Sequence, residues 1–282
     1  RSHECDYPSD LNQIIKLTSP KIDIDGNSSN IHKQITKILE NSLSVYKVDV
    51  KQLKILDPDI VITQAHCDVC AVSLKEVEEI VFKHLSEKTK IISLQPNTLN
   101  DVLEDIKRVA IGLDIEIAKV NNLIKPLIDR LENIKSKNIN QIKPKVACIE
   151  WIDPLMAAGN WIPEMVNISG GEDVFGKSGK DSHWINFKDI EEHNPDIIIF
   201  LPCGYNIEKT NNEVESLVKK NVEWRRLKAF DNKQFFVVDG NQFFNRPGPR
   251  LVESVEIFAD IIQPKLFNFN HEQSGWINFF KQ

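Results

Sequence analysis

The chain has 282 residues, of which 41% are hydrophobic and 27% are charged, so it is long enough for roughly two domains with apolar cores. Its net charge of -6 arises from well-mixed acids and bases, which excludes the basic patch expected of a nucleic-acid-binding protein and the polybasic run of a membrane-surface protein. No apolar run approaches the roughly 18 residues that a membrane-spanning helix needs.

Strand and helix patterns alternate through residues 1–113. After an opening stretch of loop and extended chain, an amphipathic helix is predicted from Asn27 and a short one over 48–56. Short strands at 60–62 and 90–94 are each followed by a helix. This alternation is typical of a parallel sheet covered by helices, so we expect an N-terminal α/β lobe over 1–113.

Residues 114–138 interrupt this alternation, because apolar residues recur there at helical spacing for more than 20 positions. A helix of that length is about 30 Å long at a rise of roughly 1.5 Å per residue. We interpret it as a connecting helix between two lobes.

A second α/β lobe is predicted over 139–265. Its strands are expected near 145–150, 196–201 and 234–239, with a final helix over 250–262. Cys148, Trp184 and Phe243 are predicted to lie in its core. The tail over 266–282 is aromatic and irregular, and its sequence indicates no role.

Residues 64–73, QAHCDVCAVS, form a predicted loop between a strand and a helix, where open α/β sheets place their ligand sites. Thiolates and imidazoles are the ligands that zinc and iron prefer. The two alternatives are a zinc or iron–sulfur site and free thiols that line a ligand site. The cysteines of the metal hypothesis are Cys5, Cys67, Cys70 and Cys203.

Aromatic residues follow the predicted strands of the second lobe. Trp151, Trp161 and Tyr205 lie next to polar residues and glycines, a setting that suits a flat ligand as well as it suits a core. Arg246 and Arg250 precede a helix, where they either hold a carboxylate or phosphate or form a solvated first turn. Two such lobes predict one ligand cleft between them.

The chain lacks the GxSxG, Walker and GxGxxG patterns, and no Ser/His/Asp set has a recognisable spacing. These absences argue against hydrolases, nucleotide triphosphatases and dehydrogenases. The sequence favours a protein that binds a ligand.

Several motifs in the same order resemble the cobalamin-binding-like substrate-binding proteins of ABC transporters. These motifs are SHECDYP (2–8), LTSPKID (17–23), TQAHCDVCAVS (63–73), IEWIDPLMAAGNWIPEMV (149–166), PCGYN (202–206) and DGNQFFNRPGPRLVE (239–253). The resemblance implies a class III periplasmic-binding-protein fold, in which two three-layer α/β lobes are joined by one long helix with the ligand cleft between them. Family members begin with a strand and helix before the first motif, so the first lobe is expected to be N-terminally truncated.

The same resemblance implies a non-catalytic protein that captures a corrinoid or related metal chelate, requires no cofactor, works as a monomer and delivers its ligand to an ABC permease. The family implies a periplasmic or cell-envelope location, while the opening residues resemble no signal peptide, which keeps the cytoplasm as an alternative. The expected ligand-binding residues are His3, Glu4, Tyr7, Gln64, His66, Trp151, Asp153, Trp161, Tyr205, Asn241 and Arg246.

A second hypothesis uses the same fold differently. In it, the chain is an intracellular metal-binding protein or enzyme with a zinc or iron–sulfur site made by the loop cysteines or His66. A third is a truncated relative without function.

Overall fold

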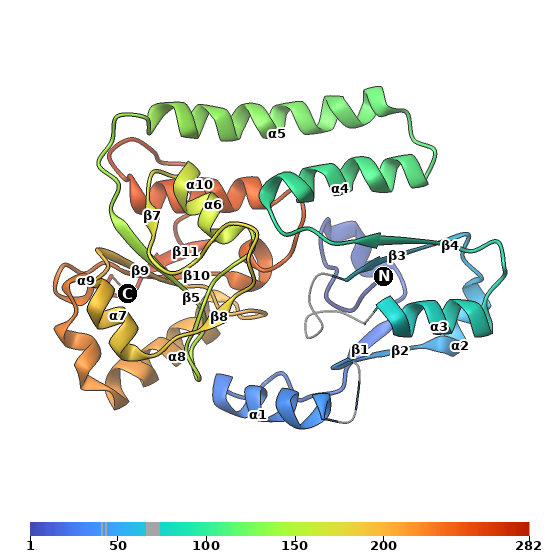
Figure 1. Cartoon of the computed structure of the whole chain (residues 1–282), viewed down its shortest axis with the longest axis horizontal. Coiled ribbons are helices and arrows are strands. Elements are labelled where there is room, and N and C mark those ends of the chain that lie inside the picture. The colour runs from blue at the N-terminus through green and yellow to red at the C-terminus, as the bar shows by residue number, and fades with distance from the viewer. Residues whose placement is uncertain (41, 43, 66–73, 282) are drawn as a thin grey trace. The chain divides into compact units, whose positions relative to one another are not determined.

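The computed structural model describes residues 1–40, 42, 44–65 and 74–281 (Figure 1). The chain packs into two compact units. An N-terminal unit comprises 1–95 and 108–115, and a C-terminal unit comprises 96–107 and 116–282. None of the described helices combines the length and the apolarity that a membrane crossing requires.

The N-terminal unit contains two small sheets. β1 (Thr18–Pro20) pairs antiparallel with β2 (Tyr46–Val48), and β3 (Ile60–Gln64) pairs parallel with β4 (Lys90–Leu94). Its helices are the 3₁₀ helix η1 (Ser9–Gln13), α1 (Ser28–Leu39), α2 (Val50–Leu56) and α3 (Leu74–His84). The opening segment therefore contains a helical turn and a strand, where only loop and extended chain were predicted.

Helix starts in this unit follow their capping residues. The Asn27 side chain accepts a hydrogen bond of 2.9 Å from the Asn30 N–H, which satisfies an amide at the start of α1. Asp49 does the same for α2, whose start therefore falls after the strand residue Val48. The helix predicted over 48–56 is thus two residues shorter than expected.

Two long helices follow. α4 (Leu99–Gly112) begins in the C-terminal unit and ends in the N-terminal one. α5 (Ile117–Lys137) confirms the predicted long helix. Its buried residues are Val120, Ile124, Leu131 and Ile134, and the last two pack in the core that contains α6 and α10.

The C-terminal unit is built on one sheet with the strand order β11-β10-β9-β5-β6-β8, and β7 also pairs with β5. The central strands β10, β9 and β5 run parallel. The strands are β5 (Lys145–Trp151), β6 (Met156–Ala157), β7 (Glu172–Asp173), β8 (His183–Trp184), β9 (Ile197–Phe200), β10 (Phe235–Val238) and β11 (Trp276–Asn278). The helices are α6 (Ile162–Ile168), α7 (Phe187–His193), α8 (Ile207–Lys220), α9 (Lys228–Asp231) and α10 (Leu251–Ile262), with the 3₁₀ helix η2 (Val222–Arg226) and the π-helical turn η3 (Gly240–Phe244).

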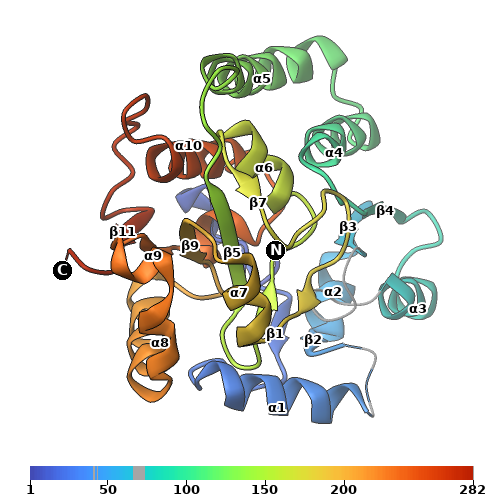
Figure 2. The same ribbon diagram turned by 60° about the vertical axis from the view of Figure 1, so that its left-hand side comes forward.

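Both faces of the central strands are buried, which explains their nearly continuous apolar sequences. Val146 and Cys148 of β5 point into one core with α5, α6 and α10, while Ala147 and Ile149 point into a second core with α7, α8 and α9 (Figure 2). The predicted core position of Cys148 is confirmed, as is that of Phe243. Trp184 is 56% exposed, so its predicted core position is wrong, because β8 is a two-residue strand at the edge of the sheet.

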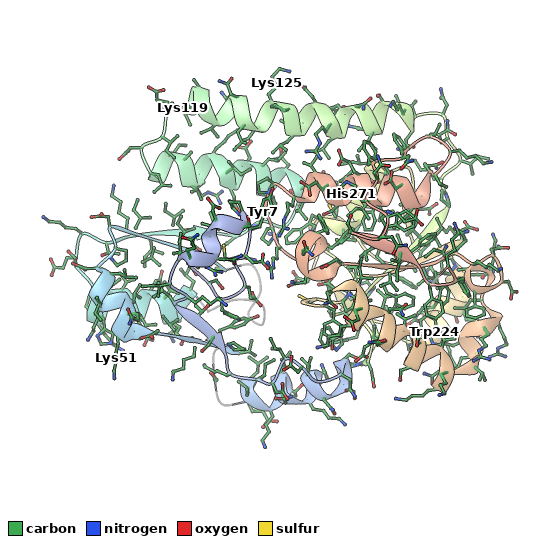
Figure 3. The ribbon with its side chains drawn as sticks, turned by 180° about the vertical axis from the view of Figure 1, so that it is seen from behind. Tyr7, Lys51, Lys119, Lys125, Trp224 and His271 are labelled. Atoms are coloured by element: carbon green, nitrogen blue, oxygen red, sulfur yellow. The ribbon has the colours of Figure 1, made fainter. Side chains whose placement is uncertain are left out.

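The C-terminal tail has a structural role that its sequence did not indicate. β11 extends the sheet by pairing antiparallel with β10, with Val237 opposite Ile277. The rings of Phe279 and Phe280 then pack on Phe235, which also contacts Trp224. Figure 3 shows Trp224 within this aromatic region. The tail therefore closes one of the two cores.

We expect Phe235→Ala to lower the free energy of unfolding of the C-terminal unit by about 3–5 kcal/mol, because a fully buried ring leaves a cavity. All five tryptophans lie between 151 and 276, so their fluorescence reports on this unit during urea unfolding. Val222→Ala is the control in the same unit, since that side chain is 62% exposed and its loss should change stability by less than about 0.5 kcal/mol. Equal effects of the two substitutions would contradict this account of the core.

Candidate functional site

Three loops meet at one edge of the C-terminal sheet. Because β5, β9 and β10 are parallel neighbours, their carboxyl ends lie together, and this edge is where α/β sheets bind ligands. The loops begin at Trp151, at Pro202 and at Asp239. They carry four of the predicted ligand-binding residues: Trp151, Tyr205, Asn241 and Arg246.

Backbone hydrogen bonds join these loops into one surface. The Cys203 N–H donates to the Glu150 carbonyl over 3.3 Å, and the Asn241 N–H donates to the Tyr205 carbonyl over 3.0 Å. Gly240 lies so close to the middle loop that a Cβ atom there would be 2.4 Å from the Pro202 carbonyl oxygen. Only glycine permits this approach.

Two aromatic rings form the floor of the candidate site. Trp151 and Tyr205 have ring centroids 5.5 Å apart, at 60° to each other, and are 8% and 2% exposed. The indole N–H of Trp151 is buried and has no hydrogen-bond partner among the described residues. Since a buried donor without a partner is costly, this group is suited to a ligand atom that accepts a hydrogen bond.

A cationic side chain lies on the third loop. The Arg246 guanidinium donates to Asn241 Oδ1 over 2.6 Å, which holds it against the π-helical turn η3. Burial raises the pKa of the Asp239 carboxyl, and two bonds from Gln242 together with the charges of Arg246 and Arg250 partly offset that rise. This end of the site therefore carries positive charge next to a buried acid.

Tyr205 stays protonated in the physiological range. Burial raises the pKa of its phenol, and the charge of Glu213 raises it further. The Lys209 ammonium lies 4.0 Å from the ring centroid in a cation–π contact. The neutral ring thus packs on Trp151 and Lys209, and only 2% of the residue is exposed.

Glu150, just before Trp151, is a half-buried acid that was not among the predicted site residues. Its Oε2 accepts a 2.6 Å hydrogen bond from the Ser182 hydroxyl, which itself accepts one from the Gly159 N–H. Burial raises the pKa of Glu150, and the bond from Ser182 offsets only part of the rise. Its position at a strand end next to a tryptophan was the only sequence signal.

Two other predicted ligand-binding residues of this unit, Trp161 and Asp153, lie in a core and in an exposed turn. Trp161 is 3% exposed and its indole nitrogen donates to the Phe244 carbonyl over 2.8 Å, so it packs in a core and offers little surface to a ligand. Asp153 is exposed, in the turn that follows β5.

Two of the predicted residues of the N-terminal unit, His3 and Glu4, contact Tyr46. The His3 ring lies 5.3 Å from the Tyr46 ring, and its Nδ1 is 2.7 Å from the Thr18 hydroxyl. Glu4 accepts a 3.0 Å hydrogen bond from the Tyr46 hydroxyl. Two further predicted residues of this unit are Tyr7, which is exposed, and Gln64, which ends β3.

The predicted metal ligands are only partly described. Cys5 and Cys203 are free, half-buried thiols, while His66, Cys67 and Cys70 lie outside the described residues. Within the described part of the chain, no three His, Cys, Asp or Glu side chains are arranged to hold a metal ion. The metal hypothesis therefore stays a prediction.

A separate groove of about 850 Å³ lies elsewhere on the C-terminal unit, lined by α4, α5 and α6. It borders β7, which pairs with the first residues of β5, at the amino end of that strand. Its lining mixes acids, lysines and aliphatic side chains. We take the strand ends as the candidate site, because the unpartnered Trp151 donor and the Arg246 charge are there.

Comparisons with known proteins agree on one family. A family model described as periplasmic binding protein matches residues 32–241. An ABC transporter substrate-binding protein from Listeria monocytogenes EGD-e is similar in structure, with a TM-score of 0.66 and 19% identity over 79% of this chain and 82% of that one. No curated protein sequence matches the chain.

Two other similar structures have ligands in their names. S. aureus IsdE, complexed with heme, has a TM-score of 0.62 and 20% identity over 77% of this chain and 81% of that chain. The periplasmic vitamin B12 binding protein BtuF of Vibrio cholerae has a TM-score of 0.57 and 16% identity over 79% and 80%. At these identities the likeness shows the fold alone.

We expect Gly240→Ala to lower the free energy of unfolding of the C-terminal unit by about 1–3 kcal/mol, since the new methyl group would press on a backbone carbonyl. Urea unfolding followed by tryptophan fluorescence measures this change. Gly248→Ala is the control, because nothing lies within 4 Å of a Cβ atom at that position and its effect should stay below about 0.5 kcal/mol. A neutral Gly240→Ala would show that the two loops do not meet.

Proposed function

The chain belongs to the periplasmic binding protein family, and from this premise we propose that it is the solute-binding component of an ABC importer for a corrinoid or a related metal chelate. The class III fold that its motifs predicted is the fold of the similar structures. Proteins of this family bind solutes without catalysis, and they work with an ABC permease.

One observation carries the ligand proposal: a buried, unpartnered indole N–H beside a second aromatic ring and an arginine, all at the strand ends. Corrins and porphyrins have broad apolar faces that pack on aromatic rings. Their edges carry amide or carboxylate groups, whose oxygens accept hydrogen bonds from an indole and ion pairs from a guanidinium. The site offers both kinds of contact at adjacent positions.

The ligands named for two similar proteins support a corrinoid or related metal chelate as the ligand. IsdE is described with heme, and BtuF is described as a vitamin B12 binding protein. We propose the same class for this chain, with the corrinoid first, because the motifs of the sequence resemble the cobalamin-binding-like group. In this proposal the protein acts as a monomer in the periplasm or at the cell envelope.

The direct test titrates the purified protein separately with hydroxocobalamin and with hemin. Saturable quenching of tryptophan fluorescence, with a shift of the ligand's visible band, is the expected result for the preferred ligand. Metal analysis of the protein before titration tests the metalloprotein alternative. No response to either compound, with stoichiometric zinc or iron already bound, would replace this proposal by that alternative.

Trp151→Phe should weaken binding by about 1–3 kcal/mol, because it removes the indole donor and leaves the ligand's acceptor unpaired while keeping a ring in place. Trp151→Ala should weaken it further, since the contact area of the ring is also lost. The dissociation constant from fluorescence or absorption titration measures both effects. Trp184→Phe is the control on an exposed tryptophan, and a Trp151 variant that binds as this control does would remove Trp151 from the site.

Arg246→Gln should weaken binding by about 1.5–3 kcal/mol, the range for hydrogen bonds to charged groups, and should flatten the dependence of affinity on salt concentration. Titrations at low and high salt test both expectations. Arg225→Gln, which changes an exposed arginine in η2, controls for the net charge. If both variants show the same small change, the arginine does not contact the ligand.

A further inference from the structure

The C-terminal tail contacts the loop that carries Arg246. The Asp239 N–H, directly after β10, donates to the Gly275 carbonyl of the tail over 2.9 Å. The ring of His271 lies 6.3 Å from the ring of Phe243, within the π-helical turn η3. Both contacts fall on the segment that positions Asn241 and Arg246.

His271 is the point where this part of the tail is anchored. Its Nε2 lies 3.2 Å from Oε2 of Glu256, an acid in the middle of α10 whose side chain is 8% exposed. Figure 3 labels His271 next to α10. Arg130 of α5 donates to the same carboxylate over 2.8 Å. The carbonyl of His271 accepts bonds from the N–H groups of Gly275 and Trp276, which closes the turn that reaches Asp239.

The loop held by this turn is itself closely connected to the site. Asp239 accepts two hydrogen bonds from Gln242, so it caps η3. Asn241 then links the loop to Tyr205 through its N–H and to Arg246 through its side chain. A short chain of direct contacts therefore connects the turn at His271 with Arg246.

We propose that His271 is a positioning residue of the ligand site: fixed by Glu256, it holds the tail turn against the loop over 239–246 and so fixes Arg246 for the ligand. This inference rests on the proposed function. His271 contacts Phe243 and Glu256 and not the Arg246 guanidinium. We therefore propose that it acts on Arg246 by keeping the loop over 239–246 ordered.

The charges around His271 make the anchor depend on protonation. Glu253, Glu256 and Asp260 of α10 face it, with Arg130 of α5 on the far side of Glu256. The hydrogen bond that His271 donates to Glu256 raises the pKa of His271, more than burial lowers it. The ion pair of the anchor is therefore complete below the ordinary histidine pKa of about 6.5 and is lost as the pH rises through the raised value, where only a neutral Nε2–H hydrogen bond remains.

The experiment compares His271→Ala, His271→Gln and a matched control, Asn278→Ala. Asn278 lies in β11 and holds another point of the same tail, because its side chain donates to the Lys233 carbonyl over 3.0 Å. The probe is whichever of hydroxocobalamin and hemin the unchanged protein binds, titrated from pH 5.5 to 8.5. Hydrogen exchange of the amides at 241–245 is measured without ligand.

We expect His271→Ala to lower affinity about five- to tenfold at pH 6 and to speed exchange at 241–245. His271→Gln, which keeps a donor but cannot titrate, should lose less affinity and should remove the fall in affinity above pH 6.5. Asn278→Ala should lower the melting temperature while keeping the affinity and its pH dependence.

Unchanged affinity and exchange in both His271 variants would overturn the inference, as would an equal loss of affinity in Asn278→Ala, which would mean that the tail acts only through stability. A failure of the unchanged protein to bind either probe would instead overturn the proposed function. Exchange at 241–245 still tests the anchor in that event.

Discussion

Parallel pairing of β5, β9 and β10 between two apolar cores is the constraint on which the C-terminal unit depends. A strand buried on both faces must be apolar along its whole length, and it can present polar groups only where it ends. The chemistry of this unit therefore collects at the carboxyl ends of the strands, where Trp151, Tyr205 and Arg246 lie. The burial that stabilises the cores therefore also restricts the candidate ligand site to the ends of the strands.

The two units differ in how completely their strands are covered. In the C-terminal unit, every residue of β9 and β10 is buried. In the N-terminal unit, β3 and β4 have at most half-buried residues, and Ile62 of β3 is exposed. Large apolar side chains such as Ile55 and Phe82 are exposed as well. By the rule that stability follows buried apolar area, the C-terminal unit contributes more stability per residue.

Local features of the fold were accessible from the sequence, and long-range ones were not. Helices with a clear apolar face or an Asn cap, such as α1 and α5, were predicted because spacing and capping are local properties. β11 was missed because a three-residue strand exists only through its pairing with β10, about 40 residues earlier in the chain. Trp184 was misplaced for a related reason, since nothing local shows that its strand lies at a sheet edge.

The candidate site shows the same division. The rule that ligands bind at strand ends was enough to select Trp151, Tyr205 and Arg246 from the sequence. It could not separate Trp161, whose indole donor is used inside the core, from Trp151, whose donor is not. The indole nitrogen of Trp161 lies 2.8 Å from the Phe244 carbonyl, and that of Trp151 has no such partner. This difference arises only when the chain is folded.

A site of this kind needs support from outside itself. A buried donor without a partner lowers stability until a ligand binds, so the loops around it tend to rearrange. In this chain the loop after β10 is held from two directions, by Tyr205 of the neighbouring loop and by the tail turn at Gly275. The tail is held in turn by Glu256, which Arg130 orients from the long helix α5. α5, α10 and the tail thus together hold the loop after β10. Segments outside the candidate site in this way contribute to its geometry.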